Sequence, residues 1–305
     1  MRFMPFRFYF FILFFSFLLL FYPGDNPYLH IFAYNREAIL NEQTFPPLKV
    51  RSIPFVQNNT PPELTAQGVY IVEVDSYTPV YEKNIHTQFF PASTTKIVTA
   101  LVAKDLYNEN DIITVKEASV EGQVMNLVPQ ERITAENLLY GMLVHSGNDA
   151  AYAVANFHGY DDFIRLMNKK AYDLHMNDTY FKNPAGLDEQ GQLTTPYDLA
   201  LAARALIQDP YLRKMVATKE IIISDVDYKY FHTLTNVNKL LGEVQGLGGL
   251  KTGYTELAGE NLVSFYRKDN HDYIIVLLKS EDRFKDTTTL VEWINANVQY
   301  ITPQL

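Results

Sequence analysis

The chain has 305 residues, of which 47% are hydrophobic, and a formal net charge of −9 at pH 7. This length suits one large domain or two small ones, and the apolar fraction is high enough for a packed core. An acidic chain is a poor partner for nucleic-acid phosphates, which proteins neutralise with Lys and Arg. Cysteine is absent, which excludes thiol catalysis, disulfides and cysteine-ligated metals and leaves the redox compartment open.

Residues 1–22 combine a basic flank with an apolar core. Arg2 and Arg7 precede an uncharged run from Phe8 to Tyr22, which is the form of an export signal. As a helix this run is about 22 Å long, shorter than the ~30 Å hydrocarbon core of a bilayer. A helix that starts at Phe3 is long enough if Arg7 reaches the interface. The sequence around Pro23 is a poor cleavage site, so we expect an uncleaved membrane anchor, with a removed signal peptide as the alternative.

The pattern of residues 23–62 predicts an extended stem. Prolines at positions 46, 47, 54, 61 and 62 break the periodicity, and the apolar residues between them form no stripe. We therefore expect three parts in the chain: an anchor or signal at 1–22, a stem at 23–62 and one folded domain at 63–305.

Residues 63–305 change from strand patterns to helix patterns and back. Two alternating runs within 68–83 flank a Ser-Tyr-Thr-Pro turn, which predicts a hairpin. Helices are predicted after Ser93, after Thr134 and after Thr195, where a capping box has Pro at the first helical position. Further strands are predicted at 220–224, 228–235, 249–255, 261–267 and 273–278, before a last helix with apolar residues between 290 and 298. This order indicates an α/β (α+β) fold, in which one antiparallel sheet is covered by terminal helices and interrupted by a helical lobe, with a ligand cleft between lobe and sheet.

The first candidate motif is Ser93-Thr94-Thr95-Lys96. Residues three apart on a helix share a face, so the Lys96 amine reaches the Ser93 hydroxyl. A serine hydroxyl is a weak nucleophile until a neighbouring base takes its proton. Lysine serves as that base only when it is neutral, which requires burial or a nearby positive charge such as Lys251. Taken alone, the motif is more often a helix cap followed by a solvated lysine.

The second motif is Ser146-Gly147-Asn148, in the break between a helix that ends near His145 and one that begins near Asp149. A hydroxyl and a carboxamide held in one turn are suited to pass a proton and to orient a peptide bond. The alternative is an ordinary helix–helix turn, in which Gly147 ends one helix and Asp149 caps the next. We interpret His145 as structural, because a lysine already serves as base and no Asp is placed to orient the imidazole.

The third motif is Lys251-Thr252-Gly253, inside the predicted strand 249–255. Alternation places Lys251 and Gly253 on one face of the strand and Thr252 on the other, unless the strand twists locally. Gly253 leaves room for a substrate backbone to lie alongside, as in strand addition. The alternative is a lysine that protects an edge strand from aggregation.

The three motifs occur in the order S-x-x-K, S-x-N and K-T-G, a set typical of β-lactamases and penicillin-binding proteins, with Gly147 where that set has Asp. The surrounding residues resemble the D-alanyl-D-alanine carboxypeptidases, the low-molecular-weight penicillin-binding proteins. The resemblance rests on four blocks, PASTTKIVTAL (91–101), LLYGMLVHSGNDAA (138–151), NPAGLDEQGQLTTPYDLA (183–200) and GLKTGYTELAGENLV (249–263). It implies the penicillin-recognising serine transpeptidase fold, which β-lactamases share, and makes 63–305 a serine D,D-peptidase domain.

The resemblance implies an enzyme that removes the terminal D-alanine of peptidoglycan stem peptides through an acyl-enzyme. Ser93 would attack the penultimate D-Ala carbonyl with Lys96 as its base. Ser146, assisted by Lys251, would carry a proton to the leaving D-alanine. The resemblance also implies β-lactams as covalent inhibitors, no metal or cofactor, and a location on the extracytoplasmic face of a bacterial cell membrane, periplasmic or at the cell surface.

Substrate binding is implied for a further set of residues. Asn148 would hold the substrate amide, and the backbone N–H groups of Ser93 and Tyr254 would form the oxyanion hole. Thr252 would bind the terminal carboxylate together with Arg283, which follows the last predicted strand where the family has such an arginine.

Departures from the family pattern bear mainly on anchoring. Larger members carry a second β-rich domain and a C-terminal amphipathic helix, for which the short stretch after Gly253 leaves no room. Anchoring is therefore expected at the N-terminus. Asn261 and His175 stand where relatives often have Cys and Gly, and we expect no catalytic consequence.

Three other activities remain open: a D,D-endopeptidase on cross-links, a class A-like β-lactamase and a non-catalytic penicillin-binding module. Class A β-lactamases deacylate with a Glu in an E-x-x-L-N stretch, and the counterpart at 182–189 does not have this pattern. A binding module has no use for an activated nucleophile, so the intact serines and lysines argue against it. An endopeptidase would use the same site, and the motifs do not separate it from a carboxypeptidase.

Overall fold

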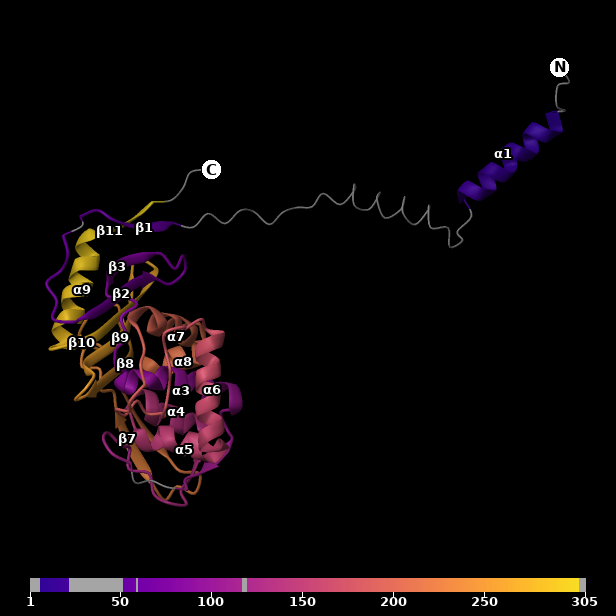
Figure 1. Cartoon of the computed structure of the whole chain (residues 1–305). Coiled ribbons are helices and arrows are strands. Elements are labelled where there is room, and N and C mark those ends of the chain that lie inside the picture. The colour runs from indigo at the N-terminus through magenta and orange to yellow at the C-terminus, as the bar shows by residue number, and fades with distance from the viewer. Residues whose placement is uncertain (1–5, 22–51, 59, 117–119, 302–305) are drawn as a thin grey trace. The chain divides into compact units, whose positions relative to one another are not determined.

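The computed structural model describes residues 6–21, 52–58, 60–116 and 120–301 (Figure 1). The chain divides into two units, residues 1–50 and residues 51–305. In the first unit the structure describes one helix, α1 (Phe6–Phe21), which is almost entirely apolar and is exposed from residue 7 to residue 20. Across the described ranges, no helix is both long and apolar enough to cross a membrane. Most of the predicted stem, residues 23–51 together with residue 59, lies outside the described residues.

The second unit begins and ends with strands and has its helices in between and near its end. Its strands are β1 (Ile53–Val56), β2 (Gly68–Glu73), β3 (Pro79–Lys83), β4 (Ile112–Thr114), β5 (Arg132–Thr134), β6 (Glu220–Ser224), β7 (Phe231–Thr235), β8 (Leu247–Thr255), β9 (Gly259–Lys268), β10 (His271–Ser280) and β11 (Val298–Ile301). Its helices are the 3₁₀ turn η1 (Ala92–Thr95), α3 (Lys96–Leu106), α4 (Ala135–Leu143), α5 (Asn148–His158), α6 (Tyr160–Asp173), α7 (Pro196–Gln208), α8 (Pro210–Val216) and α9 (Arg283–Asn297). The predicted α+β order is confirmed.

Five antiparallel strands form the main sheet, in the order β3-β2-β10-β9-β8. The hairpin predicted at 68–83 forms β2 and β3. The strands predicted at 249–255, 261–267 and 273–278 form β8, β9 and β10, each a few residues longer than predicted. The strand with the Lys-Thr-Gly motif, β8, therefore lies at one edge of the sheet.

The expectation of a single sheet is wrong for the strands near 220–235. β6 and β7 pair with each other in a separate two-stranded sheet. One face of this hairpin is buried at His232 and Leu234, whereas Phe231, Thr233 and Thr235 are exposed. Alternation predicts a strand with one covered face, but it does not identify the partner, because pairing depends on residues that are distant in the sequence.

Helices lie on both faces of the main sheet, α9 on one and the helical lobe on the other (Figure 1). Each face has its own hydrophobic core. Along β10, Ile274, Val276 and Leu278 pack into the core shared with the helical lobe. Ile275 and Leu277 pack into the core with α9. A strand covered on both faces is apolar throughout, and each fully buried side chain contributes about 1.5–3 kcal/mol. Among the described residues a single terminal helix, α9, covers the second face, where the sequence indicated several.

The helical lobe comprises α3 to α8. α7 begins as predicted, because the Thr195 hydroxyl accepts the Asp198 backbone N–H at 3.1 Å and Pro196 occupies the first turn. α4 begins in the same way after Thr134, whose hydroxyl accepts the Asn137 N–H at 3.2 Å. α6 and α8 are additional helices that the patterns used above do not include.

Part of the segment interpreted as a stem belongs to the folded unit. β1 pairs with β11 near the other end of the chain. The indole Nε1 of Trp293 donates to the Thr60 carbonyl at 2.9 Å. Residues 53–60 are therefore a correction to the predicted stem. Pro54 is tolerated in such a short two-stranded sheet, and a strand of this length with a distant partner leaves no periodic signal.

Candidate active site

The nucleophile candidate Ser93 lies in the 3₁₀ turn η1, one residue after Ala92, whose φ is 47°. Residues three apart eclipse one another in a 3₁₀ turn. The turn therefore brings Ser93 over Lys96, the first residue of α3, and the Nζ and Oγ atoms are 2.8 Å apart. The pairing arises from a tighter turn than the α-helix that the sequence predicted.

The Lys96 amino group is fully enclosed by protein. Besides Ser93, its Nζ atom lies 2.7 Å from Asn148 Oδ1 and 2.9 Å from the Ala185 carbonyl oxygen, and the residue is 0% exposed. Burial and the nearby charge of Lys251 hold the pKa of Lys96 well below its usual range, against the opposing effect of Asp149. The site therefore favours the neutral amine.

A second serine–lysine pair stands across the cleft. Lys251 Nζ donates to Ser146 Oγ at 2.8 Å and to the Thr252 carbonyl at 3.0 Å. Burial, followed by the charge of Arg283, lowers the pKa of Lys251 to about 7. Ser146 has φ of 65°, whereas Gly147 has φ of −55°. The left-handed residue of this turn is thus the serine, not the glycine that the alternative of an ordinary turn required.

The first two residues of α5, Asn148 and Asp149, form hydrogen bonds that hold the loop 121–127, which forms one wall of the cleft. Asn148 Nδ2 donates to the Glu121 carbonyl at 2.5 Å, and the Asn148 backbone N–H donates to the Gln123 carbonyl at 2.7 Å. The carboxylate of Asp149 accepts the backbone N–H groups of Met125 and Leu127, both at 3.0 Å. The loop at 121–127 is therefore held in place by backbone hydrogen bonds to two neighbouring side chains.

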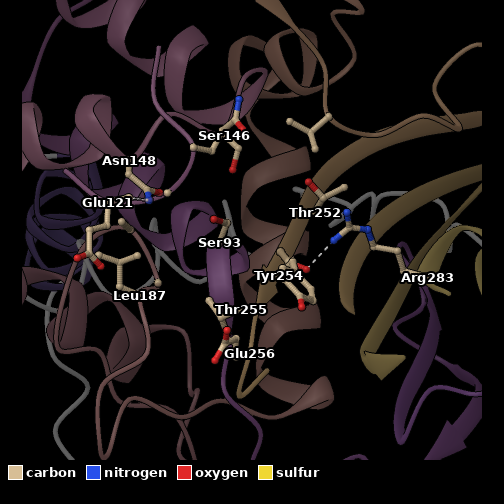
Figure 2. Close-up of a pocket in the computed structure, with 16 residues that line it drawn as sticks. Ser93, Glu121, Ser146, Asn148, Leu187, Thr252, Tyr254, Thr255, Glu256 and Arg283 are labelled. Atoms are coloured by element: carbon tan, nitrogen blue, oxygen red, sulfur yellow. Dashed lines mark hydrogen bonds between the residues drawn. The ribbon is translucent and has the colours of Figure 1, made fainter. Parts of the chain in front are cut away.

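The edge strand β8 packs directly on the Ser93 turn. A Cβ atom at Gly253 would lie 3.0 Å from the Ser93 backbone nitrogen, so a side chain there would push the strand away. Arg283 extends from the first turn of α9, and its Nη1 donates to the Gly253 carbonyl at 2.7 Å (Figure 2). Thr252 is buried beside the cleft, whereas Tyr254 is 62% exposed.

The segment 183–187 forms the opposite wall. Asn183 Oδ1 accepts the backbone N–H groups of Gly186 at 2.8 Å and Leu187 at 3.0 Å. Gly186 has φ of 88°, and a Cβ atom there would lie 1.8 Å from the Ala92 carbonyl oxygen. This close contact presents the Ala185 carbonyl to Lys96.

All nine residues proposed from the sequence lie at or directly behind one pocket of about 600 Å³. Seven of them line it: Ser93, Ser146, Asn148, Thr252, Gly253, Tyr254 and Arg283. The amines of Lys96 and Lys251 lie behind the two serines. The lining also includes residues that the sequence did not single out: Glu121, Gly122, Gln123, Ala185, Gly186, Leu187, Val237, Thr255 and Glu256. Five of these (185–187, 255 and 256) lie inside blocks already quoted for the resemblance, so their position beside the motif residues in those blocks was the available signal.

A model of the D-alanyl-D-alanine carboxypeptidase family matches residues 55–282. The chain belongs to this family. It is 34% identical over 221 residues to the D-alanyl-D-alanine carboxypeptidase DacF of Bacillus subtilis, covering 70% of this chain and 57% of that protein. It is 30% identical over 266 residues to DacD of Escherichia coli, covering 81% of this chain and 66% of DacD. The chain thus spans less than two thirds of the length of these curated relatives.

The fold of this carboxypeptidase family member also resembles solved structures. The DD-transpeptidase of Streptomyces K15 is 28% identical and superposes with a TM-score of 0.73, covering 78% of this chain and 99% of the other. The predicted penicillin-recognising fold is therefore confirmed, with its antiparallel sheet and helical lobe.

Proposed function

We propose that the protein is a serine-type D-Ala-D-Ala carboxypeptidase, with Ser93 as nucleophile and Lys96 as its base. The observation that carries this proposal is the set of atoms around Lys96 Nζ. Asn148 Oδ1 and the Ala185 carbonyl only accept hydrogen bonds, whereas the Ser93 hydroxyl also donates one. A neutral amine has two N–H donors and one lone pair. It satisfies all three neighbours and is placed to receive the serine proton.

The first chemical step forms the acyl-enzyme. Ser93 Oγ bonds to the carbonyl carbon of the penultimate D-Ala while its proton passes to Lys96 Nζ. The negative charge that develops on the carbonyl oxygen is stabilised by the backbone N–H groups of Ser93 and Tyr254, and each such donor is worth about 10²–10³ in rate. The bond to the terminal D-alanine then breaks, and Ser146 delivers its proton to the leaving amine and regains one from the Lys251 ammonium group. Water then adds to the ester carbonyl and gives one proton to the Ser146–Lys251 pair, and Lys96 returns its proton to Ser93 Oγ as the shortened peptide leaves.

The substrate lies along β8 in this proposal. β8 is an edge strand of the sheet, where an extended peptide can add alongside. Because Gly253 has no side chain, β8 lies against the Ser93 turn, so such a peptide reaches the nucleophile. Asn148 Nδ2 donates one N–H to Glu121 and has a second N–H for the substrate carbonyl. Thr252 and Arg283 both line the pocket, and Arg283 bonds to the carbonyl of Gly253, the residue after Thr252. A hydroxyl and a guanidinium there suit the terminal carboxylate.

A β-lactam would enter the same first step. Ser93 would open the lactam ring, and the amine released by ring opening remains tethered to the acyl group. That group therefore blocks the approach of water and leaves the enzyme acylated. The K15 relative is a DD-transpeptidase, so acyl transfer to an amine, as well as endopeptidase action on cross-links, would use the same groups. The contact between Arg283 and a free carboxylate favours the carboxypeptidase.

The experiment is exposure of the purified protein to a penicillin, followed by mass spectrometry of the intact chain and its peptides. We expect one adduct on the peptide that contains Ser93, and none in Ser93→Ala. Ser264→Ala, which removes a buried serine of β9, is the control and should label as wild type does. An undiminished adduct in Ser93→Ala would remove this residue from the mechanism.

We also infer that residues 1–22 direct export and hold the protein at the extracytoplasmic face of the membrane, with residues 23–51 as a tether to the domain. The support is the apolar helix α1 behind a basic flank. Membranes from cells that make the protein should retain it after washing with high salt and at alkaline pH, and release it in detergent. A mature N-terminus near Asp25, with release by salt alone, would contradict the anchor.

A further inference from the structure

Asn261 joins the Ser93 turn to the main sheet. It stands on β9, opposite Gly253 in the strand register, and is 0% exposed. Its Nδ2 donates to the carbonyls of Phe90 at 3.0 Å and Pro91 at 3.1 Å, and its Oδ1 accepts the Lys279 N–H at 2.8 Å. The carbonyls only accept and the N–H only donates, so these partners fix the orientation of the carboxamide.

The Pro91 carbonyl is the point from which the Ser93 turn starts. It accepts the Thr94 backbone N–H at 3.3 Å and the Thr94 hydroxyl at 2.6 Å as well as the Asn261 amide. The next residue, Ala92, is buried with φ of 47°, a left-handed conformation that costs a non-glycine residue about 1–2 kcal/mol. Such a conformation persists only where its surroundings are rigid. Asn261 supplies rigidity directly before Ser93.

Asn261 also holds the other side of the oxyanion hole. Its backbone pairs with Gly253, the residue before Tyr254. The Cβ position of Gly253 lies only 3.0 Å from the Ser93 nitrogen, so strand and turn meet backbone to backbone. The two proposed oxyanion donors are therefore tied to one residue, to its side chain on one side and to its main chain on the other.

We propose that Asn261 is a positioning residue that sets the separation and angle of the Ser93 and Tyr254 N–H groups. It acts through the backbone of both neighbours and does not contact the substrate. The inference rests on the proposed function, because it concerns the oxyanion hole of that reaction. Its consequence is a loss of reactivity in the bound complex with little loss of binding, since a misplacement of about 1 Å reduces rates by roughly 10²-fold.

A merely structural role would give a different result. Loss of a buried hydrogen-bonded amide lowers the stability of any fold, so stability alone does not decide the question. Asn168 on α6 offers a matched control. Its Nδ2 also donates to two carbonyls, those of Ile164 and Phe181, and its Oδ1 accepts one backbone N–H, that of Phe181. Asn168→Leu therefore breaks the same number and kind of bonds.

The experiment compares wild type, Asn261→Leu and Asn168→Leu by rapid mixing with a fluorescent penicillin over a range of concentrations. The dependence on concentration yields the acylation rate constant and the half-saturating concentration. We expect Asn261→Leu to lose roughly 10–100-fold in the rate constant, with half-saturation within about threefold of wild type. Asn168→Leu should keep both values, although its unfolding temperature falls. If Asn261→Leu does not fold, the test uses Asn261→Ser, which retains one hydrogen-bond donor. We expect its acylation rate constant to fall by about 10-fold.

An acylation rate constant within threefold of wild type in a folded Asn261 variant would overturn the inference alone, as would an equal loss in Asn168→Leu. A wild-type protein that forms no adduct at Ser93 would overturn the proposed function, and this inference with it. The two failures are therefore distinguishable in one set of measurements.

Discussion

Lys251 Nζ lies 2.8 Å from Ser146 Oγ, although 105 residues separate the two in the sequence. A second serine–lysine pair, Ser93 with Lys96, has the same distance within a single turn. Both lysines are buried, and burial lowers the pKa of each. The cleft thus contains two amines that lose a proton at lower pH than solvated lysines do, and each lies beside its own serine hydroxyl.

Lys96→Arg should abolish acylation. A guanidinium does not lose its proton near neutral pH and cannot accept the one from Ser93. We expect the rate of penicillin acylation to fall by at least 10²–10⁴-fold, the usual contribution of a general base. Lys104→Arg is the matched control on the same helix, since Lys104 pairs with Glu109 at the surface. Equal acylation by both variants would exclude Lys96 as the base.

The reaction should have a bell-shaped dependence on pH. Lys96 must be neutral, so kcat/KM rises as pH increases through its lowered pKa. Lys251 supports proton delivery and carboxylate binding in its charged form, so kcat/KM falls as pH increases beyond about 7. Burial is the main cause of the lowered pKa of Lys251 and remains in Arg283→Gln, but the added repulsion from Arg283 is removed, so the falling limb should move to higher pH. A pH–rate profile of both proteins checks this, and a falling limb with an unchanged midpoint would exclude Lys251 as its source.

Arg283→Ala should reduce the preference for a free C-terminal carboxylate. A charge-assisted hydrogen bond contributes about 1.5–3 kcal/mol, or roughly 10–150-fold. The measurement is kcat/KM for diacetyl-Lys-D-Ala-D-Ala and for its C-terminal amide, in wild type, in Arg283→Ala and in Arg165→Ala, an exposed control on α6. Equal rates on acid and amide in wild type would favour the endopeptidase. A preference that survives Arg283→Ala would leave Thr252 and Lys251 as the carboxylate site.

Gly186→Ala should damage both stability and acylation, whereas Gly191→Ala should affect stability alone. Both glycines have positive φ, 88° and 84°, so an alanine at either position is strained by about 1 kcal/mol. At Gly191 the nearest atom to the new Cβ is 3.7 Å away, but at Gly186 it is the Ala92 carbonyl oxygen at 1.8 Å. We expect a further loss of roughly 1–3 kcal/mol at Gly186. Urea unfolding and penicillin labelling check this, and equal losses in the two variants would contradict the close contact.

Removal of β1 should destabilise the domain without inactivating it. A chain that starts at Glu63 lacks the pairing with β11 and the Trp293–Thr60 hydrogen bond. We expect a loss of about 2 kcal/mol, or roughly 4–8 °C in unfolding temperature, relative to a chain that starts at Ser52. The pocket residues lie between 93 and 283, so penicillin labelling should persist. Identical unfolding temperatures would restore the interpretation of 53–62 as stem.

The sequence predicted those features that arise within a few residues of one another. The cap at Thr195, the hairpin of β2 and β3 and the spacing of Ser93 and Lys96 each depend on a local pattern. Ser146 shows where such reasoning ends. Residue propensities predict that Gly147 adopts the left-handed conformation in this turn, but the residue with φ of 65° is Ser146. The Ser146 hydroxyl accepts a hydrogen bond from Lys251, which is distant in the sequence. The expectation that Asn261 has no catalytic consequence arose in the same way, because its partners at 90, 91 and 279 are distant in sequence.

The strand order also determines when reactivity arises as the chain is synthesised. The ribosome has already synthesised four site residues by residue 150: Ser93, Lys96, Ser146 and Asn148. However, β2 cannot pair with its neighbour in the middle of the sheet until β10 (His271–Ser280) has been synthesised. Until then the nucleophile turn lacks Asn261 beneath it and β8 beside it. A ribosome-bound chain that stops short of residue 247 therefore contains the proposed nucleophile and base but not the strand β8 that forms one wall of the cleft. Pairing between strands that are so distant in the sequence is slow. Acylation by a β-lactam would therefore report that the last strands have joined the sheet.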